Sequence, residues 1–280
     1  MKNLLVFQTD FGLADGAVAA MYGVANSVDD TLKIQDLTHN IPPYSIWDAS
    51  YRLFQTIEYW PKGTVFVSVV DPGVGSDRKS VVAETNTGQY IVTPDNGTLT
   101  HVKRYVGLKA VREIDETKHR RENTEHSFTF HGRDVYALTG AKLASGTISF
   151  TEVGSTVNLA SVTELETGEI VTGKNYVQGS IDILDIRFGS LWTNIPRDTF
   201  LSIGFTYGER VEVIIRNDTI LAYNNRITYG RSFADVHVSE QLIYVNSVYN
   251  MAVAINQGNF ARAYNIGTGR HWTIQFGKEQ

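Results

Sequence analysis

Hydrophobic positions in the first half of the chain fall into short runs that alternate with segments of helical spacing. Apolar runs over residues 4–9, 32–37 and 64–70 predict strands, and residues 17–27 and 45–59 predict the helices between them. The run over 64–70 is apolar almost throughout, which is typical of a strand covered on both faces. The order strand, helix, strand, helix, strand therefore predicts an α/β domain with a mainly parallel sheet.

Capping and turn residues fix the limits of these elements. Asp15 is placed to cap the first helix, and Ser45 followed three residues later by Asp48 forms a capping box for the second. Residues 80–85 and 89–92 predict an antiparallel addition to the sheet, and a further helix is expected over 134–143, ending near Gly146.

The second half of the chain has a different pattern. Short apolar runs separated by Gly, Asn and Asp predict an all-β sandwich or barrel; the runs are 177–184, 200–203, 211–215, 242–245 and 251–255. The polar stretch over 151–169 marks a domain boundary, so we expect an α/β domain over 1–160 and a β-barrel domain over 170–280. A length of 280 residues agrees with two domains.

Composition narrows the possible functions. Net charge is −5 with no basic block, which argues against nucleic-acid binding. No apolar run approaches the ~18 residues that a membrane span needs, and Asp10 interrupts the apolar start before a signal-peptide core can form. The absence of cysteine excludes disulfides, thiolate metal sites and thiol nucleophiles. Cytoplasm is the default expectation for localisation.

Polar loops follow each of the first three predicted strands, where α/β sheets bind ligands. Asp10, Asp15 and Asp71 therefore lie along one edge and suit a polyol or a cation, although Asp in such loops is also a common cap and turn former. The glycines near Asp71 match neither a Walker loop nor a dinucleotide fingerprint, so ATP and NAD are not the expected ligands. The seven histidines show no metal-binding spacing, and no Gly-x-Ser-x-Gly elbow is present.

Five motifs in order give a more specific indication. They are TDFG at 9–12, DPGVG at 71–75, PDNG at 94–97, FHGRD at 130–134 and FGSLWTNI at 188–195. Together they resemble the S-adenosylmethionine (SAM) hydrolase family, also called SAM hydroxide adenosyltransferases, whose superfamily includes fluorinases and chlorinases. The resemblance spans nearly the whole chain. It implies hydrolysis of SAM to adenosine and L-methionine, with no metal and no cofactor. It also implies a homotrimer whose sites lie between the α/β domain of one subunit and the barrel of its neighbour.

The resemblance also assigns residues. Asp71, Arg78 and His131 match the Asp–Arg–His set of the hydrolases, and either His131 or Asp71 is the base. The matching substrate-binding residues are Asp10 for the ribose diol, Asp15 and Asp185 for the ammonium group, Ser247 for the methionine portion, Tyr44 for the ribose face, and Phe188, Phe233 and Ser190 for adenine. Gly132 replaces a halogenase serine. Val248 replaces a halogenase arginine, which leaves the methionine carboxylate to Ser247 and backbone N–H groups.

Three activities remain to be distinguished. Hydrolysis by water attacking C5′ is the leading hypothesis. A chloride-using halogenase is disfavoured because the carboxylate of Asp71 repels halide. A SAM- or adenosine-binding protein without turnover is the third. Without the resemblance, Asp71 and Arg78 would be interpreted as an ordinary structural ion pair. A methyltransferase is less favoured because a typical Gly-rich SAM loop is absent from the sequence.

Overall fold

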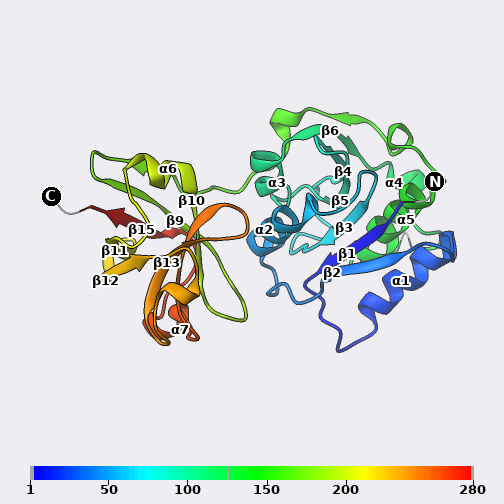
Figure 1. The fold of residues 1–280 in the computed structure, drawn as a ribbon. Coiled ribbons are helices and arrows are strands. Elements are labelled where there is room, and N and C mark those ends of the chain that lie inside the picture. Colours follow the sequence, from blue (N-terminus) through cyan, green and yellow to red (C-terminus); the bar gives the residue numbers. More distant parts are fainter. Residues whose placement is uncertain (1–2, 125, 279–280) are drawn as a thin grey trace. The chain divides into compact units, whose positions relative to one another are not determined.

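The computed structural model describes residues 3–124 and 126–278. The chain divides between Leu165 and Glu166 into two compact units. The first unit contains a seven-stranded sheet of order β2-β1-β3-β5-β4-β6-β7 (Figure 1). Its strands are β1 (Leu5–Thr9), β2 (Ile34–Thr38), β3 (Val65–Val69), β4 (Ser80–Thr85), β5 (Tyr90–Pro94), β6 (Leu108–Glu113) and β7 (Thr156–Val157).

Parallel pairing joins the strands that position the predicted site. β1 pairs in parallel with β2 and β3, and β3 pairs in parallel with β5, whereas β4 runs antiparallel to β5 and β6. The predicted parallel sheet and its antiparallel addition are therefore confirmed. Because β1 and β3 end at the same edge, the loops that carry Asp10 and Asp71 emerge side by side.

Helices cover both faces of this sheet. The helices are α1 (Ala17–Val28), α2 (Ile46–Ile57), α3 (Thr100–Tyr105), α4 (Glu116–His119) and α5 (Leu138–Ser145). Successive residues of β1 alternate between the two cores, because Leu5 and Phe7 pack toward α1 and α5 while Val6 packs toward α2 and α3. All five residues of β1 and of β3 are buried, as expected for strands covered on both faces.

Capping follows the prediction at the start of α2 but not at the start of α1, where Gly16 and not Asp15 is the N-cap. The Ser45 hydroxyl accepts a hydrogen bond from the backbone N–H of Asp48 at 3.3 Å, at the start of α2. Asp15 accepts one from Ala17 N–H at 2.9 Å, at the start of α1. The predicted helix over 134–143 begins with a π-helical turn, Gly132–Ala137, directly after His131. Its α-helical part, α5, ends at Ser145 and is followed by Gly146 in the left-handed conformation. Single π-turns often occur at functional sites.

The second unit is a closed barrel. Its sheet has the order β10-β14-β13-β12-β11-β15-β9-β8, and β10 also pairs with β9, which closes seven strands into a ring. The strands are β8 (Val171–Thr172), β9 (Tyr176–Leu184), β10 (Leu191–Pro196), β11 (Arg210–Asn217), β12 (Ile220–Tyr229), β13 (Gln241–Val245), β14 (Asn250–Ile255) and β15 (Gly269–Gly277). The barrel carries two short helices, α6 (Arg197–Ser202) and α7 (Phe260–Tyr264).

One predicted strand is wrong. Residues 200–203 lie largely in α6, which follows Pro196 and has Asp198 in its first turn. A negative charge near a helix N-terminus is favourable, and a run of four apolar residues does not by itself separate strand from helix. Phe200 is nevertheless fully buried, as its hydrophobicity predicts. Over the residues that the structure describes, no helix is both long and apolar enough to cross a bilayer.

Candidate active site

Asp71, Arg78 and His131 form one contiguous polar chain in the first unit. Both carboxylate oxygens of Asp71 accept from Arg78, with Nε to Oδ1 at 2.8 Å and Nη2 contacting Oδ2. Nη2 of Arg78 lies 3.2 Å from Nδ1 of His131. Asp71 and Arg78 lie in the loop after β3, and His131 directly precedes the π-turn. Arg78 and His131 are more than fifty positions apart in the sequence.

This chain is largely removed from solvent. The exposed fractions of the Arg78 and Asp71 side chains are 10% and 5%, and His131 is also buried. Burial lowers the pKa of His131. The charges of Glu116 and Asp71 raise it and those of Arg120 and Arg78 lower it, and the net shift is downward, which favours the neutral imidazole. Burial is the largest single influence on Arg78 and by itself would lower its pKa. The hydrogen bond to Asp71, together with the charges of Tyr136, Asp71 and Glu116, outweighs burial, so the pKa is raised. The site thus holds a permanent cation beside a neutral imidazole.

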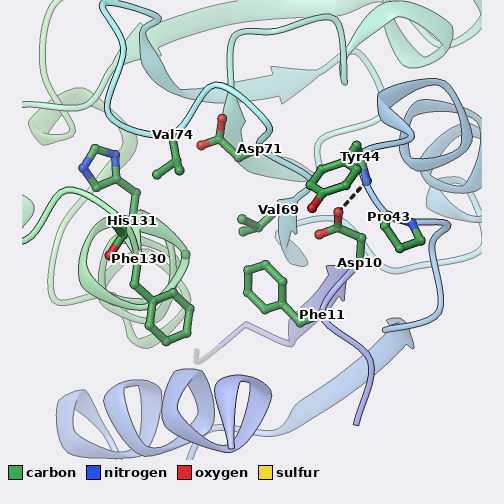
Figure 2. Close-up of a pocket in the computed structure, with 11 residues that line it drawn as sticks. Asp10, Phe11, Pro43, Tyr44, Val69, Asp71, Val74, Phe130 and His131 are labelled. Atoms are coloured by element: carbon green, nitrogen blue, oxygen red, sulfur yellow. Dashed lines mark hydrogen bonds between the residues drawn. The ribbon is translucent and has the colours of Figure 1, made fainter. Parts of the chain in front are cut away.

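A pocket of about 270 Å³ opens beside this chain. Figure 2 shows His131 and Asp71 on one side of it and Asp10 with Tyr44 on the other. Asp10 Oδ2 accepts from the backbone N–H of Tyr44 at 2.8 Å. Tyr44 has φ +68° and an exposed ring, a strained backbone for a residue with a Cβ. Such strain occurs often at binding sites, where the surrounding structure holds it.

The loop that carries Asp10 is tied to the loop after β2. The Thr9 hydroxyl lies 2.8 Å from Nδ1 of His39, and Nε2 of His39 lies 3.0 Å from Asp36 Oδ1. The Thr9 hydroxyl also accepts from Phe11 N–H at 3.1 Å, and Gly12 N–H donates to the His39 carbonyl at 2.8 Å. Asp10 is therefore held between two anchored neighbours.

Aromatic rings form another wall of the pocket. Phe11 and Phe130 meet edge to face with their centroids 5.7 Å apart. A Cβ built on Gly132 would lie 3.2 Å from Phe11 Cζ and 3.4 Å from Phe130 Cε2. Glycine at 132 therefore lets these two rings close against the backbone beside His131.

The second unit has a separate, larger pocket of about 870 Å³. The loop between β9 and β10 supplies Asp185, Phe188 and Ser190, and the turn between β13 and β14 supplies Ser247. Phe188 is 69% exposed and Phe233 39% exposed, so both offer ring surface to a ligand. The hydroxyl of Tyr244 accepts from Trp192 Nε1–H at 3.2 Å at the same pocket.

The structure thus groups most of the predicted site residues into two sets. Asp10, Tyr44, Asp71 and His131 line the first pocket, and Arg78 contacts two of them. Asp185, Phe188, Ser190, Phe233 and Ser247 line the second. Asp15 lies on the exposed loop before α1 and is not among the residues lining either pocket.

Sequence reasoning missed several residues. Phe11, Val74 and Phe130 line the first pocket, and Trp192, Tyr244 and Asn246 line the second. Phe11, Val74, Phe130 and Trp192 lie inside the five motifs, so their position in the motifs was an available indication. Across the described residues, no group of three or more His, Asp or Glu side chains is arranged to hold a metal ion.

Comparisons with known proteins define the class. Residues 5–154 match the family model of the SAM hydroxide adenosyltransferase N-terminal domain, and residues 179–273 match that of the C-terminal domain. The chain therefore belongs to the SAM hydroxide adenosyltransferase family.

Particular relatives agree with that assignment. The (R)-S-adenosyl-L-methionine hydrolase of Methanocaldococcus jannaschii is 36% identical over 220 residues, covering 77% of this chain and 74% of the relative. A fluorinase of Actinopolyspora mzabensis is 25% identical over 292 residues, covering 96% and 95%. A crystal structure described as an uncharacterized conserved protein from Thermotoga maritima superposes with a TM-score of 0.89 at 32% identity, covering 98% and 100%.

Proposed function

We propose that this protein hydrolyses SAM to adenosine and L-methionine by in-line attack of water on C5′. The observation that carries the proposal is the contiguous Asp71–Arg78–His131 chain at the edge of a pocket that also holds Asp10. Support comes from the family membership and from the hydrolase relative, which is more similar to this chain than the fluorinase relative is.

The substrate needs positioning more than activation. Its sulfonium is already a good leaving group: as oxygen bonds to C5′, the C5′–S bond breaks and its electron pair neutralises the sulfur. Holding the nucleophile in line can contribute about 7–11 kcal/mol in well-oriented cases. Asp10 accepts two hydrogen bonds from the ribose diol in this proposal, and the ring of Tyr44 lies against the ribose.

The polar chain serves the attacking water. Arg78 stays protonated and stabilises developing hydroxide character. The hydrogen bond from Nε of Arg78 to Asp71 holds the guanidinium in place. His131 offers a neutral ring nitrogen beside the water. The water proton leaves to this trio and then to solvent, so one water and one SAM give adenosine, methionine and one proton. A positioned acid–base group of this kind contributes about 10²–10⁴-fold.

The second pocket supplies the remaining substrate contacts in the proposal. The rings of Phe188 and Phe233 pack against adenine, and Ser190 offers it a polar contact. Asp185 pairs with the substrate ammonium and Ser247 contacts the methionine portion. Asp15, from the exposed loop before α1 of the first unit, is the second proposed partner of the ammonium.

We also propose a homotrimer in which the first pocket of one subunit is completed by the second pocket of its neighbour. The division of the site residues into two incomplete sets supports this arrangement. Mixing subunits tests it: Asp71→Asn protein and Phe188→Ala protein, each weakly active alone, regain activity together if sites are shared. No recovery after dissociation and reassembly contradicts shared sites. The cytoplasmic location remains a prediction.

Product analysis tests the activity itself. Incubating the purified full chain with SAM, with and without high chloride, and separating products by mass spectrometry is expected to give adenosine and methionine in equal amounts under both conditions. The appearance of 5′-chloro-5′-deoxyadenosine identifies a halogenase instead. Tight SAM binding without any product identifies a binding protein.

A further inference from the structure

His131 is clamped between two arginines, only one of which belongs to the predicted trio. Nδ1 of His131 lies 3.2 Å from Arg78 Nη2, and Nε2 lies 2.9 Å from Arg120 Nη2. Arg120 follows the last residue of α4 and is as well buried as Arg78, with 11% of its side chain exposed. Each ring nitrogen therefore faces a buried guanidinium.

The second arginine has its own carboxylate. Arg120 Nη2 donates to Glu116 Oε2 at 2.6 Å across one turn of α4. The arrangement around His131 is thus doubled: Asp71 holds Arg78 on the Nδ1 side, and Glu116 holds Arg120 on the Nε2 side.

Ser80 joins the two halves into a closed ring of polar contacts. Its hydroxyl donates to Glu116 Oε1 at 3.0 Å and lies 3.4 Å from Arg78 Nη1. The buried hydroxyl of Tyr136 lies 3.2 Å from the hydroxyl oxygen of Ser80. This ring fixes Glu116, and through it Arg120, relative to the Asp71–Arg78 pair.

A neutral imidazole cannot satisfy both arginines. It has one nitrogen that accepts and one that carries hydrogen, whereas guanidinium groups only donate. One of the two contacts must therefore be between two donors. The shorter separation lies on the Arg120 side, at 2.9 Å against 3.2 Å, and it falls at the usual length of an N–H hydrogen bond.

We propose that Arg120, anchored by Glu116, is a positioning residue that donates to Nε2 of His131 and so keeps the ring proton on Nδ1. The Nδ1–H and the Nη2–H of Arg78 are then two neighbouring donors, and a single oxygen can accept from both. On this account, which rests on the proposed hydrolysis, His131 holds the water as a donor and is not its base.

The proton then goes to Asp71. This carboxylate lines the pocket, and each of its oxygens keeps a lone pair beyond the one that Arg78 uses. The water O–H bond breaks toward Asp71 as the oxygen bonds to C5′, and the carboxylic acid releases its proton to solvent after the product forms.

Among the residues that the structure describes, the other charged side chains near His131 in the sequence pair with each other and not with its ring nitrogens. On its own element, Arg133 binds Asp134 through Nε at 2.7 Å and Nη2 at 2.8 Å, and Arg121 approaches Asp134 at 3.5 Å. Four charged side chains therefore act on the ring. The carboxylates of Asp71 and Glu116 raise the pKa of His131, and the guanidinium groups of Arg78 and Arg120 lower it.

The tautomer of His131 tests the proposal without substrate. Selective ¹⁵N-histidine labelling and long-range ¹H–¹⁵N correlation distinguish Nδ1–H from Nε2–H, and a His131→Asn sample identifies the relevant signals among the seven histidines. Wild-type protein is expected to show Nδ1–H at pH 7.5. In Arg120→Gln the main form is expected to become Nε2–H, because only Arg78 then donates to the ring. A wild-type ring protonated at Nε2, or no change in Arg120→Gln, overturns the proposal.

The pKa of His131 in two variants distinguishes a local change of charge from a general loss of structure. Arg120→Gln removes a positive charge and is expected to raise the pKa of His131, whereas Glu116→Gln removes a negative charge and is expected to lower it. Disruption of packing would move both in one direction, which contradicts the proposal. If Arg120→Gln does not fold, the wild-type tautomer and the Glu116→Gln shift still decide.

Kinetics supply the last comparison. Arg120→Gln is expected to lower kcat about 10²-fold with KM for SAM little changed, while Arg121→Gln, the neighbouring arginine, retains the wild-type tautomer. Unchanged kcat in Arg120→Gln overturns the proposal. If wild-type protein does not hydrolyse SAM, the proposed function fails, and the NMR result separately decides the role of Arg120.

Discussion

The hydroxyl of Thr9 and Nδ1 of His39 lie 2.8 Å apart and join the loops that follow two adjacent parallel strands, β1 and β2. Asp10 lies next to Thr9, and Gly12 N–H binds the carbonyl of His39. The position of Asp10, the carboxylate proposed to bind the ribose, therefore depends on a histidine that does not line the pocket.

Replacing that histidine is expected to weaken substrate binding. His39→Ala removes the partner of Thr9 and frees the Asp10 loop, so KM for SAM should rise about 10-fold, which corresponds to about 1.4 kcal/mol, while kcat changes less. Steady-state kinetics measure both. His237→Ala, at an exposed histidine, is the control. A loss confined to kcat contradicts a role through Asp10.

The charge of Asp71 is expected to matter far more than its size. Asp71→Asn keeps the shape of the side chain but removes the charge that holds Arg78, so kcat should fall by about 10²–10⁴-fold. Binding of SAM, measured by calorimetry, should stay within a few-fold. Asp77→Asn changes an exposed carboxylate in the same loop and should leave kcat unchanged. Equal losses in the two variants would mean that general loop disruption, and not the trio, is responsible.

Gly132 stands where the resemblance places a halogenase serine, so we expect it to distinguish this site from a halide site. Gly132→Ser restores the halogenase residue type but places a Cβ 3.2 Å from Phe11 Cζ, so Phe11 must shift. Hydrolysis should fall about 10-fold, and no chlorinated product should form at high chloride because Asp71 still repels the anion. Gly132→Ala separates crowding from the hydroxyl. Formation of 5′-chloro-5′-deoxyadenosine by Gly132→Ser contradicts the role given to Asp71.

Acid sensitivity is expected to arise partly from His101. This buried side chain bonds Ser50 at 2.9 Å and packs on Trp47 and Tyr51. Burial lowers its pKa to about 3, whereas the unfolded chain titrates near ~6.5. Between these values the unfolded state binds the proton more tightly, so the free energy of unfolding decreases as pH falls, by about 1.4 kcal/mol per unit.

Urea unfolding at pH 7.5 and pH 5.0 measures this effect. His101→Gln should be less stable at pH 7.5 but should lose about 2 kcal/mol less than wild type on acidification. His271→Gln, at an exposed histidine paired with Asp218, should keep the wild-type pH dependence. An identical pH dependence in His101→Gln would remove His101 as the cause.

The sequence predicted those parts of the fold where one pattern has one structural meaning. The buried strands β1 and β3 have continuous apolar runs, and Ser45 with Asp48 marks the start of α2, so these elements were predictable. Residues 200–203 were not, because four apolar residues serve a strand or a short helix equally well. The strand β12 was missed because three consecutive exposed polar residues, 224–226, interrupt its apolar positions.

The candidate site divides in the same way. Asp71 and His131 lie in recognisable motifs, whereas Glu116 and Arg120 look like an ordinary charged pair one helical turn apart. Only the fold brings Arg120 to within 2.9 Å of His131, and no local pattern encodes a contact that depends on the position of α4 beside the π-turn. His39 was missed for the same reason, since its partner Thr9 lies thirty residues away.

In the proposed reaction, water presented by Asp71, Arg78 and His131 attacks C5′ of SAM. Running the reaction in H₂¹⁸O and measuring the mass of the adenosine formed tests this directly. One ¹⁸O atom in the 5′-hydroxyl, with methionine unlabelled, is the predicted result. Adenosine without the label would contradict direct attack by water on C5′.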